Sequence, residues 1–341
     1  PSPTRESSTS LLFAVTTQRA MSTLTASSVN TAAHDASKGR RATDLVVGDN
    51  YGIVLGCPRS GTTYLSRLLK TIPEFECMIG TLLPTSIPHV VNQPLSPSVY
   101  NALAVGFERS LDAYLHSGRY NSRAMAVQKW ANARTGICGL YNAIFHPREQ
   151  PARMIYKEPA LAFAPQFVLD AFPTGKILHI YRDGRDCANS LVKTYDVLTD
   201  EKLRSPLSME ARMGRPYDDR YIPWWVEEGR DEEFIQSTPY VRSAWMWSFM
   251  VRQCHNVLQP LEDGNSENIL QVRYEDLVSD PKTYGPAIVE FFGGQPTRAL
   301  ERLLANARTS SIGKYKRRPA DEIRAAERIA QSELELYGYD V

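Results

Sequence analysis

Short apolar runs alternate with stretches of helical periodicity from residue 51 onward. Tyr51–Leu55, Lys176–Tyr181 and Asn268–Val272 have the length and composition of buried strands, and Arg153–Tyr156 is a shorter run of the same kind. A turn and then a helix-like segment follow these runs. Because strands that alternate with helices assemble into a parallel sheet, the pattern predicts an α/β fold with a doubly wound, mainly parallel sheet.

The alternation of strands and helices is interrupted over residues 71–150, which lie between the predicted strands Tyr51–Leu55 and Arg153–Tyr156. This stretch contains several prolines and two helix-like segments, residues 99–115 and 123–134, without a clear strand. We therefore predict a helical insertion over residues 71–150. Ligands of open α/β sheets bind beyond the carboxyl ends of the strands, so an insertion at this point is well placed to shape the pocket of a second substrate.

The first 44 residues differ in composition from the rest of the chain. They are rich in Ser and Thr and poor in acidic residues, and Leu11–Val15 is their only apolar run. We interpret residues 1–44 as a disordered tail, with an organelle (plastid) transit segment or an extension upstream of a start at Met21 as alternatives. Residues 45–341 then form one α/β domain with its insertion.

The charge balance narrows the class of partner. The 341 residues include 39 basic and 38 acidic side chains, which disfavours nucleic-acid or membrane-surface binding driven by bulk charge. No apolar segment reaches the roughly 18 residues of a membrane span. The five cysteines are odd in number and form no CxxC pair, which fits a reducing compartment. The sequence thus favours a cytoplasmic protein with a small partner.

The turn after the first strand carries the strongest chemical signal. Gly56 and Gly61 have the GxxxxG spacing of a phosphate-binding P-loop, but Thr62 stands where that loop has its lysine. The cation is instead Arg59, whose planar guanidinium can bind two oxygens of one anion. The backbone N–H groups at the start of the following helix are also expected to point toward the bound anion. This P-loop-like strand–turn–helix unit is therefore predicted to bind an anion.

A second turn of the same kind follows residues 176–181. There the strand runs directly into Arg182, and Ser190 follows eight residues later on the next helix. Two turns along a helix, the Ser190 hydroxyl can face back toward the strand end. Arg182 and Ser190 can then share a second anion.

Four motifs in this order resemble those of the sulfotransferases that use 3′-phosphoadenosine 5′-phosphosulfate (PAPS). They are the loop Cys57–Thr63, the Arg182 and Ser190 pair, Tyr274 in RYEDLVSDP, and Ile312–Tyr315. The loop has the Pro-Arg form of tyrosylprotein-type and many bacterial-type members. The resemblance covers residues 51–340.

The resemblance implies a role for each motif. The implied donor-binding residues are Arg59, Ser60, Gly61, Thr62 and Thr63 at the 5′-phosphosulfate, Arg182 and Ser190 at the 3′-phosphate, Tyr274 at the adenine, and Gly313, Lys314 and Tyr315 over the nucleotide. Lys157, in a Lys-x-Pro setting, is expected near the transferred group.

The implied reaction moves a sulfonate group from PAPS to a hydroxyl acceptor and releases adenosine 3′,5′-bisphosphate (PAP). Arg59 would stabilise the charge that develops on the leaving phosphate. The donor has no β,γ-phosphates to chelate, so no metal is expected. Small molecules, carbohydrates and peptide tyrosines all remain possible acceptors.

The resemblance does not identify the general base. Gly80 stands where tyrosylprotein-type members have a glutamate, and Glu158-Pro159 stands near the histidine of cytosolic members. Glu158, Glu76 and His89 are the candidates.

Two other classes of function are compatible with the turns. A P-loop kinase or nucleotide hydrolase would use Asp183 and Asp276 as metal carboxylates, although the loop lysine is missing. A non-catalytic nucleotide sensor would keep both turns and would not need Lys157.

Overall fold

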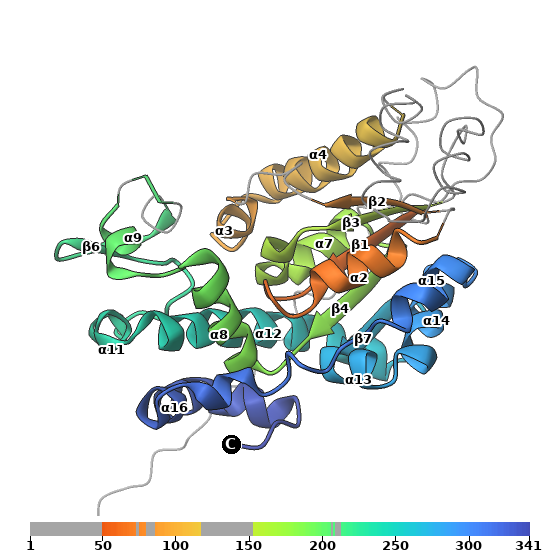
Figure 1. Cartoon of the computed structure of the whole chain (residues 1–341). Helices are drawn as coiled ribbons and strands as arrows, with labels where there is room; N and C mark the ends of the chain where they lie inside the picture. The colour runs from red at the N-terminus through yellow and green to blue at the C-terminus, as the bar shows by residue number, and fades with distance from the viewer. Residues whose placement is uncertain (1–49, 73–74, 80–85, 117–152, 206, 209–212) are drawn as a thin grey trace, which may run out of the picture. The chain divides into compact units, whose positions relative to one another are not determined.

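A five-stranded sheet forms the centre of the structure (Figure 1). The computed structural model describes residues 50–72, 75–79, 86–116, 153–205, 207–208 and 213–341. The strands lie in the order β2-β3-β1-β4-β7, and every neighbouring pair is parallel. Their bounds are β1 Tyr51–Leu55, β2 Phe75–Ile79, β3 Arg153–Lys157, β4 Lys176–Tyr181 and β7 Ile269–Arg273.

The register of the sheet brings distant parts of the chain to one edge. Val54 of β1 pairs with Lys157 at the end of β3, while the next residue of β1 pairs with β4 at His179. Tyr181 at the end of β4 pairs with Arg273 at the end of β7. Because these strands are parallel, the turns that follow them leave the sheet at the same edge.

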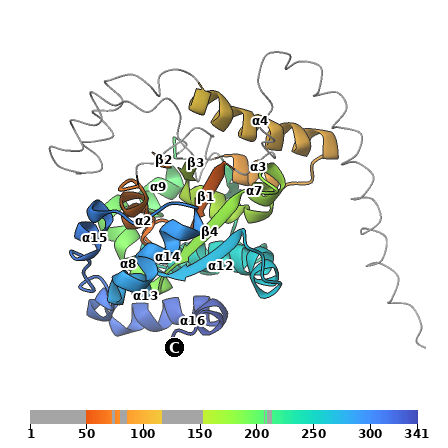
Figure 2. The same ribbon diagram turned by 90° about the vertical axis from the view of Figure 1, so that its right-hand side faces the viewer.

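Helices cover both faces of the sheet (Figures 1 and 2). Alternate residues of β1 therefore face different cores: Ile53 and Leu55 belong to one apolar cluster, and Val54 belongs to the other. This confirms the predicted doubly wound α/β fold. On the first face lie α4 Pro97–His116, α7 Pro165–Ala171, α8 Gly184–Tyr195, α12 Pro239–Asp263 and α16 Ala320–Leu336; on the second lie α2 Thr62–Leu69, α13 Tyr274–Ser279, α14 Pro281–Phe291 and α15 Arg298–Leu304.

Strand β2 corrects one prediction. Residues 71–150 were expected to be wholly helical, yet Phe75–Ile79 pairs in parallel with the whole of β3. The strand is short, and Glu76 interrupts its apolar run while being only 3% exposed. A buried carboxylate in a five-residue strand hides the apolar pattern from which strands are predicted.

The rest of the described insertion is helical. It consists of α3, Ile87–Val91, and of α4, which begins and ends close to the predicted helix at residues 99–115. The predicted helix at residues 123–134 and the predicted tail at residues 1–44 lie outside the described residues.

The region between α8 and α12 contains more structure than the sequence predicts. Its sequence has no strand-like or helix-like run, but short elements pack there around an aromatic cluster that includes Trp225, Phe234 and Trp245. Elements of three to six residues are too short for a periodic pattern. They are α9 Asp200–Arg204, β5 Arg215–Tyr217, β6 Arg220–Ile222 and α11 Asp231–Gln236; two 3₁₀ helices elsewhere are η2 Pro159–Phe163 and η3 Lys314–Arg317. Within the described ranges, no helix has the length and apolarity needed to cross a membrane.

Candidate functional site

The turn after β1 has a backbone that only glycine fits at its last position. Gly61 has a φ of 103°, and a Cβ placed there would lie 2.3 Å from Cδ2 of Tyr274. Arg59 also adopts a left-handed backbone, with a φ of 76°. For a residue with a side chain this conformation costs about 1–2 kcal/mol. Such strain often marks functional turns, and here it sits at the predicted anion site.

The hydroxyl groups of this turn have different surroundings. Ser60 is fully buried, and its Oγ donates to the carbonyl oxygen of Cys57 at 2.7 Å. It therefore closes the turn, whereas the sequence predicted it as a donor to the anion. Thr62 is buried and Thr63 is exposed at the start of α2, where the first backbone N–H groups have no intrahelical acceptor.

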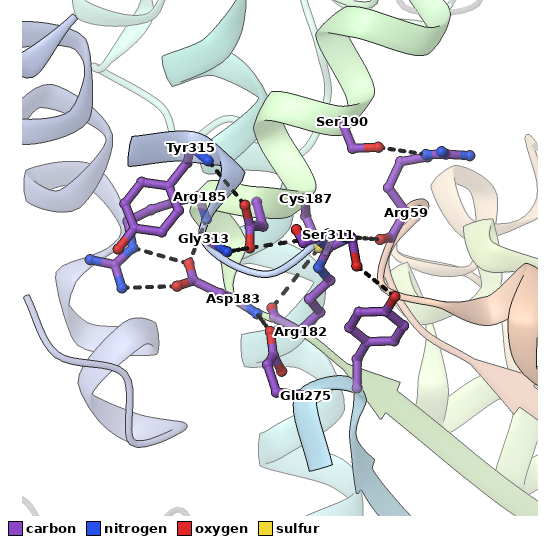
Figure 3. Close-up of polar contacts among 12 residues, drawn as sticks. Arg59, Arg182, Asp183, Arg185, Cys187, Ser190, Glu275, Ser311, Gly313 and Tyr315 are labelled. Carbon is purple, nitrogen blue, oxygen red and sulfur yellow. Dashed lines mark hydrogen bonds and ion pairs between the residues drawn. The ribbon is translucent and has the colours of Figure 1, made fainter. Parts of the chain in front are cut away.

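The Arg59 side chain crosses from this turn to α8 (Figure 3). Its Nε donates to Oγ of Ser190 at 2.9 Å. Its guanidinium carbon lies 5.4 Å from the centre of the Tyr195 ring, and one terminal nitrogen is 3.5 Å from the Tyr195 hydroxyl oxygen. The two residues predicted to bind opposite ends of one nucleotide are thus in direct contact.

The Arg182 side chain connects the turn after β1 to the segment around Ser311. One terminal nitrogen donates to the carbonyl oxygen of Arg59 at 3.1 Å, and the other donates to the carbonyl oxygen of Ser311 at 2.6 Å. The second nitrogen also lies 3.4 Å from a carboxylate oxygen of Asp186. Arg182 Nε is buried and has no hydrogen-bond partner within the described chain. Arg182 and Ser190 are therefore linked through Arg59 and share no direct bond.

Tyr274 contacts all three of the segments described above: the turn after β1, Arg182, and the segment around Ser311. Its ring centre is 4.8 Å from the guanidinium of Arg182, and its hydroxyl oxygen is 2.8 Å from Oγ of Ser311. Its ring edge fills the space beside Gly61. The register of β4 and β7 explains this meeting, because Arg182 and Tyr274 directly follow two paired residues at the strand ends.

Residues 313–315, the covering segment that is implied to lie over the nucleotide, are held by a buried carboxylate. Asp186, 1% exposed, accepts hydrogen bonds from the backbone N–H of Gly313 at 2.7 Å and of Tyr315 at 3.1 Å (Figure 3). The Tyr315 ring is buried beneath the guanidinium of Arg185 at 4.4 Å. Lys314 between them is exposed. Tyr315 thus anchors the segment, and Lys314 presents its charge to solvent.

The start of α8 is held by a second set of bonds. Asp183 caps the helix by accepting from the backbone N–H of Arg185 at 2.9 Å, and its own N–H donates to Glu275 at 3.1 Å. Burial raises the pKa of Glu275 above its ordinary value. The indole N–H of Trp247 donates to the carbonyl oxygen of Arg182 at 3.0 Å. These bonds fix the backbone from which Arg182 projects.

Lys157 and Glu158, both predicted to act in catalysis, have different surroundings at the end of β3. Burial lowers the pKa of Lys157, the nearby charges of Lys70 and Arg59 lower it further, and Glu158 raises it. Lys157 pairs in the sheet with Val54 of β1, two residues before the turn that begins at Gly56. Glu158 is buried and caps η2, where its carboxylate accepts from the backbone N–H of Ala160 at 3.1 Å. That bond gives Glu158 a structural role beside its predicted role as a base.

The other two candidate bases lie in separate places. Glu76 is in the edge strand β2, opposite Met154 of β3. His89 is in α3, and its ring centre is 5.4 Å from that of Trp224. Both residues thus come from the insertion, and His89 is one of the described residues that line a cavity of about 330 Å³.

Three residues of the site were missed by the sequence analysis. They are Asp186, Tyr195 and Ser311, none of which was assigned a role from the sequence. The position of Asp186 in the first turn of α8, four residues after Arg182, was a usable signal, because an acidic residue so near in sequence can pair with Arg182. The contacts of Tyr195 and Ser311 depend on the tertiary fold and left no local signal.

The described residues contain no group of three or more His, Cys, Asp or Glu side chains placed to hold a metal ion. On the chemistry of the donor, we expect a chelator such as EDTA to leave turnover unchanged. The measurement is the initial rate of sulfonate transfer with and without EDTA. Turnover that disappears with EDTA and returns only with Mg²⁺ would instead favour the kinase-like mechanism.

Comparison with known proteins adds a family assignment. A family model described as "Sulfotransferase family" matches residues 53–231. Among solved structures, the sulfotransferase domain of the Synechococcus PCC 7002 olefin synthase is 18% identical, with a TM-score of 0.46, over 89% of this chain and 100% of that domain. Sulfotransferase STF9 from Mycobacterium avium is 16% identical, with a TM-score of 0.42, over 87% of this chain and 79% of STF9. Mouse sulfotransferase SULT7A1 complexed with PAP is 12% identical, with a TM-score of 0.42, over 84% of this chain and 85% of SULT7A1. A search of curated proteins gave no significant match.

Proposed function

The chain belongs to the sulfotransferase family, and from this premise we propose that it transfers a sulfonate group from PAPS to a hydroxyl acceptor and releases PAP. Family membership favours this reaction over the kinase and sensor alternatives. The single observation that supports the choice of donor is the joined pair of anion turns. Arg59 of the first turn is bonded to both Ser190 and Arg182 of the second.

The two turns suit a nucleotide with phosphate groups at two positions. The start of α2 and Arg59 form the site for the 5′-phosphosulfate. Arg182, whose buried Nε has no partner among the described residues, and Ser190 form the site for the 3′-phosphate. Tyr274 stands beside both turns, where an adenine ring can stack on it.

Transfer of the sulfonate requires positive charge near the oxygen that bridges sulfur and the 5′-phosphate. The bond between sulfur and the bridging oxygen of the 5′-phosphate breaks while a bond to the acceptor oxygen forms. Negative charge develops on the bridging oxygen, and Arg59 with the N–H groups of α2 stabilises it. Lys157, which ends β3 beside β1 and is partly desolvated, stabilises the sulfonate and the leaving oxygen.

The test of this function is nucleotide selectivity. We expect PAP to bind much more tightly than 5′-AMP, because its 3′-phosphate gains charged hydrogen bonds of about 1.5–3 kcal/mol. Arg182→Ala should weaken PAP binding at least about tenfold and remove most of the preference. Isothermal titration calorimetry on both proteins measures this.

The matched control is Arg252→Ala, which removes an arginine of α12 that pairs with Glu227 and Glu333. It should keep the preference for PAP. Because Arg182→Ala leaves the buried Asp186 without its ion-pair partner, Arg182→Lys is tested beside it as a variant that keeps the charge. Equal affinity of the wild-type protein for PAP and 5′-AMP would rule out the 3′-phosphate site and most of the case for PAPS.

A further inference from the structure

The residues that follow α16 fold back onto the start of α8, beside the backbone that carries Arg182. We propose that Tyr339, acting through Glu275, positions Arg182 for the 3′-phosphate and so sets the preference of the protein for a donor that carries this group. The inference rests on the proposed function. It adds to that function two positioning residues that act on the nucleotide through Arg182.

A single peptide unit joins Arg182 to Asp183, and side chains bind both of its polar groups. The carbonyl oxygen of Arg182 accepts a hydrogen bond from the indole N–H of Trp247 at 3.0 Å. The N–H of the same unit, which belongs to Asp183, donates to Oε1 of Glu275 at 3.1 Å (Figure 3). Because a peptide unit is planar, these two bonds fix its orientation and with it the direction in which the Arg182 side chain leaves the backbone. Glu275 therefore provides one of the two restraints on Arg182.

Tyr339 in turn holds the Glu275 carboxylate. Its hydroxyl group donates to Oε2 of Glu275 at 3.1 Å, so each carboxylate oxygen has its own donor. The guanidinium of Arg273 lies 4.4 Å from the centre of the Tyr339 ring, and its Nε is 3.7 Å from Oε2 of Glu275. Tyr339 is 6% exposed and the Glu275 side chain is 12% exposed. A carboxylate with so little access to water depends on these donors for its position.

The end of α16 places Tyr339 by a Schellman motif. Gly338 has a left-handed backbone with a φ of 71°, and its N–H donates to the carbonyl oxygen of Glu335 at 3.0 Å. The N–H of Tyr339 donates to the carbonyl oxygen of Leu334 at 2.8 Å. These are the two backbone bonds of that motif, which accompanies an apolar contact such as the buried side chains of Leu334 and Tyr339 can make. Tyr339 thus reaches Glu275 from a hydrogen-bonded helix end.

A second contact joins the same segment to α8. One terminal nitrogen of Arg185 donates to the carbonyl oxygen of Asp340 at 2.8 Å. The Nε and the other terminal nitrogen of Arg185 donate to the Asp183 carboxylate at 3.0 and 2.9 Å. Asp183 is therefore connected to the residues after α16 through its backbone and through its side chain. A displacement of this segment would shift the residue that directly follows Arg182.

A shift of Arg182 should change chiefly the binding of the 3′-phosphate. Hydrogen bonds between a guanidinium and a phosphate are strong only near about 3 Å and in good alignment. PAP makes these bonds, whereas 5′-AMP has no 3′-phosphate. The ratio of the affinity for PAP to the affinity for 5′-AMP therefore reports the position of Arg182. A general loss of packing would instead weaken the binding of both nucleotides.

The test is Tyr339→Phe, which keeps the ring over Arg273 but removes the hydroxyl group that donates to Glu275. We expect the affinity ratio to fall about threefold to tenfold, the range for one hydrogen bond, while the affinity for 5′-AMP stays near its wild-type value. Isothermal titration calorimetry measures both affinities. The matched control is Tyr337→Phe, which removes a hydroxyl group at the same helix end that donates to the carbonyl oxygen of Val251 at 3.2 Å. It should keep the wild-type ratio.

A double-mutant cycle separates positioning from a purely structural role. In the Arg182→Ala background, Tyr339→Phe should leave the affinity ratio unchanged, because the side chain through which it acts is gone. Three outcomes would overturn the proposal: a wild-type ratio in Tyr339→Phe, the same loss of ratio with and without Arg182, or an equal loss of affinity for both nucleotides. A wild-type protein with equal affinity for PAP and 5′-AMP would instead contradict the donor assignment on which the inference rests.

Discussion

Replacing Arg59 with alanine is expected to lower kcat by roughly 10²–10³-fold, the range for losing one preorganised group that stabilises transition-state charge. The residue holds a strained left-handed backbone, and its guanidinium is directed to Ser190 across the two anion turns. Its side chain is only partly buried. Turnover should therefore fall while the melting temperature changes little. Steady-state kinetics and calorimetric unfolding measure the two effects.

Two matched variants separate charge from backbone strain at this position. Arg59→Gly relieves the left-handed strain and should be more stable than Arg59→Ala by up to about 1 kcal/mol, yet equally inactive. Arg59→Lys keeps the charge but loses the planar fork, and should lie between wild type and alanine. If Arg59→Gly retained wild-type kcat, the guanidinium would have no part in the reaction.

The fold was largely predictable because its central strands are mostly apolar. β1 and β4 were predicted with their observed bounds, since strands buried on both faces form continuous apolar runs. Strand β2 was missed because it carries the buried Glu76. Its partner is β3, more than seventy residues later, so only the tertiary structure identifies it as a strand.

The site was predictable only where the residues form local motifs. Arg59 and Arg182 follow strands and precede helices, and this arrangement is visible in sequence. Their contact is not, because it depends on the neighbouring positions of β1 and β4 in the sheet. The bond between Ser311 and Tyr274 and the bonds that Asp186 accepts from the covering segment join residues more than thirty positions apart. Such contacts leave no periodic signal.

Replacing Lys157 with alanine is expected to lower kcat by roughly 10²–10³-fold as well. Burial and the charges of Lys70 and Arg59 hold the pKa of Lys157 below the ordinary lysine value, and Glu158 opposes them. A lowered pKa means that the folded state disfavours the ammonium group. Loss of this charge should therefore not reduce the melting temperature at neutral pH. Turnover of the wild-type protein should fall at alkaline pH as Lys157 loses its proton. Because the pKa of Lys157 is lowered, this fall should occur at a lower pH than it would for an ordinary lysine.

Lys70→Ala is the matched control for this prediction. It removes a neighbouring cation at the end of α2 without touching the strand end that carries Lys157. It should leave kcat near the wild-type value and move the alkaline limb of the rate profile to higher pH, because one of the charges that lower the pKa of Lys157 is gone. Lys157→Ala with wild-type kcat would remove Lys157 from the reaction. An alkaline limb that stays in place in Lys70→Ala would mean that another group titrates there.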